Sequence, residues 1–247
     1  MELSENNIST PPTESFLSRT ERLIGKEGVR LLKDAKICVF GVGGVGGYAV
    51  EALARCGVGH LTLIDPDAVS VSNINRQIIA THNTVGRLKT SVAKERIHSI
   101  SPDTTVEEIN IFYTEECADI FDPSGFDYVI DCIDHVAGKI EIISRSHSAG
   151  VPVISSMGAG NKLDPTAFKV ADISKTHSDP LAKAVRTRLR KLGINHLKVV
   201  FSDEPPVVTS AGSPASISYV PSVAGLIIAS EVIKDIALRS NKDPSAT

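Results

Sequence analysis

A glycine-rich turn and an acidic residue in the first third of the chain have the types and spacing of a nucleotide site. The sequence Gly41-Val42-Gly43-Gly44-Val45-Gly46 follows the apolar run 37–40 and precedes a predicted helix. Glycines let the backbone approach phosphates closely, and a helix N-terminus favours anions. Asp65 ends the next apolar run, where a carboxylate can bind ribose hydroxyls. The pattern favours nucleotide binding over a merely structural turn.

Charged side chains farther along favour a triphosphate over a dinucleotide. The segment Asn73-Ile74-Asn75-Arg76-Gln77 and Lys89 supply amides and two cations, which a highly charged triphosphate requires. Asp131 and Asp134 end a later apolar run, and two carboxylates there suit Mg²⁺. Taken singly, the cations could be solvated surface charges and Asp131 could cap a helix. Together, around one crevice, these residues favour ATP with magnesium.

The elements that must position these residues alternate between strand and helix. Residues 36–64 indicate a strand, a turn, a helix and a second strand. The following elements are predicted as a helix near 85–99, a strand at 106–112, a short helix near 115–121, a strand at 128–131, a helix near 137–149 and a strand at 151–155. Strands apolar on both faces are typical of parallel sheets. The pattern predicts a doubly wound, Rossmann-like α/β fold, mostly parallel, with helices on both faces.

The pattern loosens after Gly158. Asp179-Pro180 predicts a helix start, followed by an apolar face of Leu181, Val185, Leu189 and Leu192. Residues 203–221 are rich in Pro, Ser and Gly and indicate a loop. A closing helix is predicted at 222–238. Its predicted core stripe is Val223, Leu226, Ile227, Ile233 and Ile236.

Composition narrows the class of protein. The 247 residues carry a net charge of −3, 42% are hydrophobic and 4% are aromatic with no Trp, which argues against a polycation or a base-stacking platform. No apolar run is long enough to span a bilayer, and residues 1–16 resemble a disordered tail rather than a targeting signal. The four cysteines are isolated from one another. We therefore expect a cytoplasmic protein without membrane contact.

The glycine turn, Asp65, the Asn-x-x-Arg-Gln segment, Lys89 and the D-x-x-D motif resemble the ubiquitin-activating-like ThiF/MoeB/HesA superfamily of adenylating enzymes. Within it, further segments resemble the tRNA threonylcarbamoyladenosine dehydratases. These segments are Ser18-Arg19-Thr20, Leu23-Ile24-Gly25, Leu163-Asp164-Pro165-Thr166, Val170-Ala171-Asp172-Ile173 with Thr176, Asp179-Pro180-Leu181 and Tyr219-Val220-Pro221-Ser222. The likeness implies one adenylating domain at 17–239, with a nucleotide-binding core at 36–155, a substrate- and tRNA-facing segment at 158–221, the closing helix at 222–238 and a tail at 240–247.

The resemblance also implies an activity and roles for single residues. The activity is ATP-dependent closure of threonylcarbamoyl-adenosine, next to the tRNA anticodon, to its cyclic form through a carboxyl adenylate. The implied phosphate ligands are Gly41, Gly43, Gly44, Gly46, Asn73, Arg76, Gln77 and Lys89. Asp65 is implied to hold the ribose and Asp134 the Mg²⁺. Arg19 matches an arginine that superfamily homodimers insert into the partner's site, so a homodimer is expected.

The positions of the cysteines help to distinguish a tRNA-modifying enzyme from one that adenylates a carrier protein. Relatives that adenylate the C-terminal glycine of a ubiquitin-like or sulfur-carrier protein usually carry a later catalytic cysteine, but no cysteine follows Cys132 here. Cys132 itself is interpreted as packing rather than as a nucleophile. An NAD-dependent oxidoreductase is disfavoured by the cations, and a silent nucleotide-binding scaffold stays open. A sulfur-transfer partner is also left open.

A basic cluster suggests where tRNA binds. No acidic residue lies between Pro180 and Ser202, and Lys183, Arg186 and Arg190 share one face of the predicted helix. The alternative is an ordinary solvated helix face. We interpret these three residues as contacts to RNA phosphates.

Overall fold

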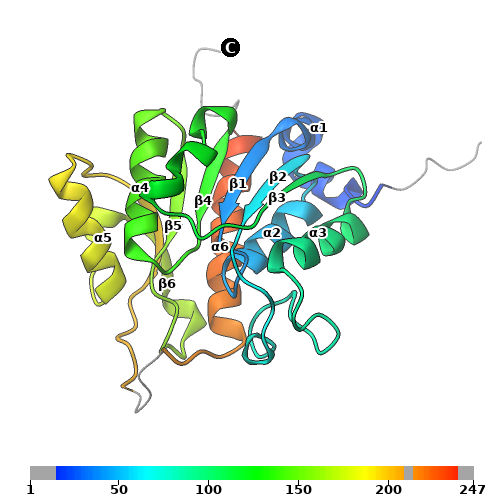
Figure 1. The fold of residues 1–247 in the computed structure, drawn as a ribbon. Coiled ribbons are helices and arrows are strands. Elements are labelled where there is room, and N and C mark those ends of the chain that lie inside the picture. Colours follow the sequence, from blue (N-terminus) through cyan, green and yellow to red (C-terminus); the bar gives the residue numbers. More distant parts are fainter. Residues whose placement is uncertain (1–14, 209–213, 239–247) are drawn as a thin grey trace, which may run out of the picture.

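The computed structural model describes residues 15–208 and 214–238, and these contain one seven-stranded sheet (Figure 1). The strand order is β3-β2-β1-β4-β5-β7-β6, and every pair is parallel except β6 with β7. The strands are β1 Lys36–Phe40, β2 His60–Ile64, β3 Thr105–Ile109, β4 Tyr128–Asp131, β5 Val153–Ser156, β6 Phe168–Asp172 and β7 Lys198–Ser202. The doubly wound α/β prediction is confirmed.

Helices cover both faces of the sheet. They are α1 Ser18–Asp34, α2 Gly46–Arg55, α3 Lys89–Ile100, α4 Val136–Ser148, α5 Pro180–Lys191 and α6 Tyr219–Ala237. Alternation along β1 assigns its side chains to the two faces: Ile37 and Val39 pack in the same cluster as α2 and α6, whereas Cys38 and Phe40 pack with Ile142 of α4. All four of these β1 side chains are fully buried, which explains the uninterrupted apolar run in the sequence.

Several predicted boundaries in the first half shift by a few residues. The helix predicted near 85–99 begins only at Lys89, because Leu88 is extended and Ala68 forms a bridge with it. The strand predicted at 106–112 ends at Ile109, and the short helix near 115–121 is a 3-10 helix, Glu115–Ile120. Helix α1 and the antiparallel strand β6 had no counterpart in the prediction.

The closing helix α6 differs from the prediction in its start and in its buried face. It begins at Tyr219, and Pro221 is tolerated because it lies in the first turn. The fully buried positions include Val220, Ala224, Ile228 and Val232, whereas Leu226 of the predicted stripe is 46% exposed. Small residues determine this face: a Cβ on Gly225 would lie 2.2 Å from the Val45 carbonyl oxygen at the start of α2.

Helix α5 begins as predicted. The Asp179 carboxylate accepts a hydrogen bond from the backbone N–H of Ala182 at 3.0 Å, and Pro180 occupies the first position. Val185 and Leu189 are fully buried, but Leu192 is 57% exposed because the helix ends at Lys191. The predicted apolar face therefore lacks its last member.

Parts of the predicted loop and tails lie outside the described residues, namely 1–14, 209–213 and 239–247. Within the described ranges, no helix has both the length and the apolar character needed to cross a membrane. All four cysteines are free thiols.

Candidate active site

A cavity of about 850 Å³ opens at the carboxyl ends of the parallel strands. It lies where β1 neighbours both β2 and β4, with the following helices packed on opposite faces of the sheet. Open α/β sheets bind ligands at such a reversal of strand order. The sequence-predicted residues among those lining the cavity are Gly41, Gly43, Gly44, Asp65, Asn73, Arg76, Gln77, Lys89 and Asp134.

The glycine turn brings backbone donors to this cavity. Gly41 has a φ of 83°, and a Cβ there would lie 2.9 Å from the Cys132 carbonyl oxygen. At Gly46, which begins α2 and does not line the cavity, a Cβ would lie 1.8 Å from the Gly41 carbonyl oxygen. The backbone N–H groups of Gly43 and Gly44 have no hydrogen-bond partner among the described residues. Free N–H groups ahead of a helix N-terminus suit an anion such as a phosphate.

Asp65 braces the turn from the neighbouring strand. Its carboxylate is buried and accepts hydrogen bonds from the backbone N–H groups of Val42 at 2.7 Å and Asp67 at 2.9 Å. Lys89 Nζ lies 3.6 Å from Asp65 Oδ1 and 2.6 Å from Asp67 Oδ2. Asp67 was not predicted from the sequence as a partner of Lys89, although its place two residues after Asp65 could have indicated a second carboxylate at the end of this strand. Asp65 and Lys89 are thus held together beside the glycine turn.

The Asn-x-x-Arg-Gln segment supplies two side chains that are anchored by hydrogen bonds and one that has an unpaired buried oxygen within the described ranges. Asn73 Oδ1 accepts a hydrogen bond from the Ser70 backbone N–H at 3.1 Å, and the Arg76 guanidinium donates to the Ser72 carbonyl at 3.0 Å. Gln77 is only 6% exposed, and its Oε1 lacks a hydrogen-bond partner in the described part of the chain. A buried amide oxygen without a partner is costly, so Gln77 is suited to contact a bound ligand.

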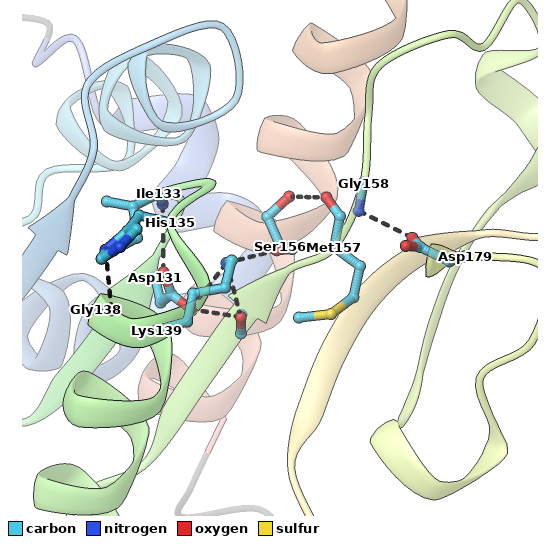
Figure 2. A network of polar contacts seen from close by, with 10 residues as sticks. Asp131, Ile133, His135, Gly138, Lys139, Ser156, Met157, Gly158 and Asp179 are labelled. Carbon is cyan, nitrogen blue, oxygen red and sulfur yellow. Dashed lines mark hydrogen bonds and ion pairs between the residues drawn. The ribbon is translucent and has the colours of Figure 1, made fainter. Parts of the chain in front are cut away.

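The first acid of the D-x-x-D motif is not available to a metal, which corrects the paired-carboxylate interpretation. Asp131 and Lys139 are both fully buried, and their charged atoms lie 2.9 Å apart (Figure 2). Ser155 Oγ donates to the same Asp131 oxygen at 2.6 Å, and Lys139 also donates to the Ser156 carbonyl at 2.8 Å. Asp131 is therefore fully committed to α4 and β5.

Asp134 has the opposite character. Its carboxylate is exposed at the cavity and forms no hydrogen bond or ion pair with any described residue. No cluster of three or more His, Cys, Asp or Glu suited to a metal occurs in the described ranges. A single free carboxylate fits Mg²⁺, which is commonly held by one or two carboxylates together with phosphate oxygens and waters.

The Cys132 thiol is poorly suited to be a nucleophile. Burial, with a further contribution from the Asp131 carboxylate, raises its pKa to about 12. The thiolate is the reactive form, and this environment strongly disfavours it. The packing interpretation of Cys132 is consistent with this environment.

Besides Gly46, four predicted functional residues lie outside the cavity. Arg19 is exposed on α1 and does not line it. On α5, Lys183 and Arg190 are exposed, whereas Arg186 is partly buried and donates to the Thr176 carbonyl at 2.9 Å. The Arg186 guanidinium, through Nη1, thus ties α5 to backbone carbonyls of the 3-10 helix Ile173–Lys175 and of Thr176 that follows it.

The doubly wound sheet and the cation-lined cavity define a nucleotide-binding α/β protein. The ThiF family model matches residues 17–246, and the chain belongs to the ThiF family. The tRNA threonylcarbamoyladenosine dehydratase of Bacillus subtilis is 47% identical in an alignment that covers 92% of this chain and 98% of that protein.

Solved structures agree with this assignment. The crystal structure of Escherichia coli tRNA N6-threonylcarbamoyladenosine dehydratase, TcdA, in complex with AMP matches with a TM-score of 0.87 and 36% identity. The match covers 95% of this chain and all of that one. The complex of the same protein with ATP matches with a TM-score of 0.86 and 36% identity, covering 92% of this chain and 96% of that one.

We predict that Lys139→Met lowers the free energy of unfolding by about 3–5 kcal/mol, because it leaves the Asp131 carboxylate buried without its counter-charge. Urea unfolding measures this. The double variant Asp131→Asn/Lys139→Met removes both charges and should recover part of the loss. Lys94→Met, which breaks the more exposed pair with Glu108, serves as the control and should cost less than about 1 kcal/mol. Equal stability of Lys139→Met and the wild type would contradict this account.

Proposed function

We propose that this protein catalyses the ATP-dependent dehydration of threonylcarbamoyl-adenosine in tRNA to its cyclic form. The observation that carries the proposal is the 47% identity to a tRNA threonylcarbamoyladenosine dehydratase along 98% of that relative's length. The cavity supports it, since one space of about 850 Å³ joins the glycine turn, Lys89 and Asp134. ATP binding is supported by the AMP and ATP complexes of the similar Escherichia coli enzyme.

The proposed roles follow from position and charge. The free N–H groups of Gly43 and Gly44 bind phosphate oxygens at the start of α2. Lys89 and Arg76 neutralise the triphosphate and contribute to charge stabilisation in the transition state. Asp65 holds the ribose hydroxyls and keeps the turn in place through the Val42 N–H.

Asp134 is the residue that would hold Mg²⁺. A bound Mg²⁺ would supply positive charge to the phosphate groups. The pair of Asp131 with Lys139 keeps Asp134 at the cavity, because Asp131 Oδ1 accepts a hydrogen bond from the Ile133 N–H at 3.3 Å. The position of the free carboxylate thus depends on the buried one.

The chemistry is a condensation in two displacements. An oxygen of the threonyl carboxylate attacks the α-phosphorus of ATP, the bond to the β-phosphate breaks, and pyrophosphate leaves. The urea nitrogen that joins the adenine to the carbamoyl carbon then attacks the activated acyl carbon and loses its proton, and AMP departs with the former carboxylate oxygen. The net change is closure of a ring with loss of water. Alignment and charge neutralisation are the contributions that the cavity can make.

Adenylation of a carrier protein's C-terminal glycine is the alternative. No cysteine follows Cys132 in the chain, and the half-buried Cys132 thiol has a raised pKa. These two features disfavour transfer of an activated carrier to an enzyme thiol. The tRNA substrate is therefore the better supported of the two.

Incubation with ATP, Mg²⁺ and tRNA tests the proposed activity. We expect AMP and pyrophosphate to appear with tRNA that carries threonylcarbamoyl-adenosine, and not with the same tRNA lacking that group. Asp134→Ala should lower the rate by about 100-fold or more, because a ligand of the phosphate charge is removed. Release of orthophosphate alone, or equal turnover without the modification, would refute the proposal.

We further infer that the protein forms a homodimer in which Arg19 acts on the partner's cavity. Arg19 is exposed on α1 and does not line the cavity of its own chain. Leu23 on the same helix is 86% exposed and Leu226 on α6 is 46% exposed, and these two helices pack against each other. Large exposed apolar side chains on neighbouring helices are typical of an interface.

Mixed dimers test the trans role of Arg19. A dimer assembled from one Arg19→Ala subunit and one Asp134→Ala subunit retains one intact site, so we expect about half of the wild-type activity per dimer. Each variant alone should be nearly inactive. Tandem affinity purification with two tags isolates the mixed dimer for the assay. An inactive mixed dimer, or a protein that sediments as a monomer at assay concentration, would disprove the trans arrangement.

We propose that tRNA phosphates contact the exposed face of α5. Lys183 and Arg190 are exposed there, and no acidic side chain lies between Pro180 and Ser202 to oppose them. The first turn of α5 also borders the cavity through Pro180 and Leu181. The N-terminal end of α5, in which Lys183 lies, is therefore at the cavity that the modified base would enter.

The salt dependence of tRNA binding measures this contact. For Lys183→Ala/Arg190→Ala we expect weaker binding, and a slope of log affinity against log salt that is shallower by about 1.5 to 2. Lys33→Ala/Lys94→Ala removes the same charge from α1 and α3 and should leave the slope nearly unchanged. Equal slopes for the two double variants would show that α5 does not contact the RNA backbone.

A further inference from the structure

Lys162 lines the cavity on the side opposite to the glycine turn. In the sheet, β4 separates the strand that leads into the turn, β1, from the strand that precedes Lys162, β5. Lys162 belongs to the segment between β5 and β6, and its side chain is almost entirely buried, at 3% exposure. The sheet order β2-β1-β4-β5 separates two groups of cations. Lys89 and Arg76 follow β2, whereas Lys162 follows β5, so Asp134 after β4 lies between them in strand order.

The Lys162 ammonium has one hydrogen-bond acceptor and no paired carboxylate. Its Nζ donates to the backbone carbonyl of Glu204. No carboxylate of a described residue forms an ion pair with it within 4.0 Å. An ammonium has three donors, so two remain for another partner.

The two acids nearest to Lys162 are already engaged by backbone groups. The Glu204 carboxylate accepts hydrogen bonds from Leu163 N–H at 3.0 Å and Asp164 N–H at 2.9 Å. The Asp179 carboxylate accepts from Gly158 N–H at 2.9 Å, visible in Figure 2, and caps α5 through Ala182 N–H. Both acids hold the loops that form the cavity wall and leave the ammonium without a direct counter-charge.

The buried Lys162 ammonium lacks a counter-ion within the described part of the chain. Burial is the main cause that lowers the pKa of Lys162, and the more distant Asp179 and Glu204 only partly oppose it. Buried charges in proteins are normally paired, because an unpaired one loses its hydration without compensation. An anion that enters the cavity supplies the missing partner.

We propose that Lys162 binds the carboxylate of the acyl substrate and holds it for attack on ATP, which makes Lys162 a specificity-determining residue. This inference rests on the function proposed above and names how the acid is recognised. An oxyanion at this place could also come from ATP or from the tRNA backbone. Strand order favours the substrate carboxylate, because the glycine turn follows β1 and the phosphate-binding cations follow β2, on the other side of β4 from Lys162.

Steady-state kinetics distinguish ATP from the modified tRNA as the source of the anion. For Lys162→Met, which keeps the length of the side chain, we expect the KM for modified tRNA to rise roughly 10- to 100-fold, as for loss of a charged hydrogen bond. The KM for ATP should stay within about twofold. Lys162→Arg should recover part of the loss, and Lys94→Met is the matched control on α3. A change in the KM for ATP alone would overturn the proposal.

A binding cycle tests the contact directly and also applies if Lys162→Met is unstable. An anticodon stem-loop carrying the threonylcarbamoyl acid is compared with the same stem-loop carrying the carboxamide, each with a nonhydrolysable ATP analogue. The wild type should prefer the acid by roughly tenfold or more. Lys162→Gln should bind the two equally. Undiminished preference in this variant would overturn the assignment, and equal loss of both ligands would place the anion in the tRNA backbone.

The two proposals fail in different ways. If the wild type releases no AMP with modified tRNA, the proposed function is wrong. If the wild type is active and prefers the acid, but Lys162→Met and Lys162→Gln leave the KM and the preference unchanged, only the role of Lys162 is wrong. Thermal unfolding of each variant shows that the comparison is made between folded proteins.

Discussion

The buried ion pair of Asp131 with Lys139 ties together three elements at the edge of the sheet where the cavity opens. It connects the end of β4 to α4 and, through the Ser155 hydroxyl and the Ser156 carbonyl, to the end of β5. The second Asp131 oxygen holds the Ile133 N–H and so the start of the turn that carries Asp134. A fully buried pair is sensitive to loss of either member, so the geometry of this edge depends on both.

The acidic residues around the cavity fall into two groups, those that hold loops through hydrogen bonds and one that has no partner in the described part of the chain. Asp65, Asp179 and Glu204 all accept backbone N–H groups and hold the loops around the cavity. Asp134 is exposed there without a partner among the described residues. A carboxylate that braces a loop has part of its acceptor capacity occupied, whereas a free one has all of it available to a cation. Asp134 is therefore identified as the acid suited to bind a metal, because the other three carboxylates are engaged by backbone N–H groups.

The sequence was informative where local pattern decides the structure. The apolar runs of β1, β2 and β4 and the glycine turn predicted the sheet edge, because parallel strands buried on both faces leave a recognisable composition. It was misleading where tertiary contacts decide. The buried face of α6 follows small residues such as Gly225, which fit against α2, rather than the larger Leu226. Lys139 and Lys162 could not be distinguished from surface lysines, because only the fold buries them.

The cavity chemistry favours direct ring closure over a thiol intermediate. Cys132 is the cysteine among the described cavity-lining residues, and burial beside Asp131 disfavours its thiolate. A covalent relay would need an exposed, electropositive thiol close to the activated acyl group. A substrate whose own nitrogen attacks the activated acid needs no enzyme thiol. It needs one cation that holds the phosphate and a second cation that holds the carboxylate in line with it. Lys89 at the end of β2 and Lys162 beyond β5 are placed for that arrangement.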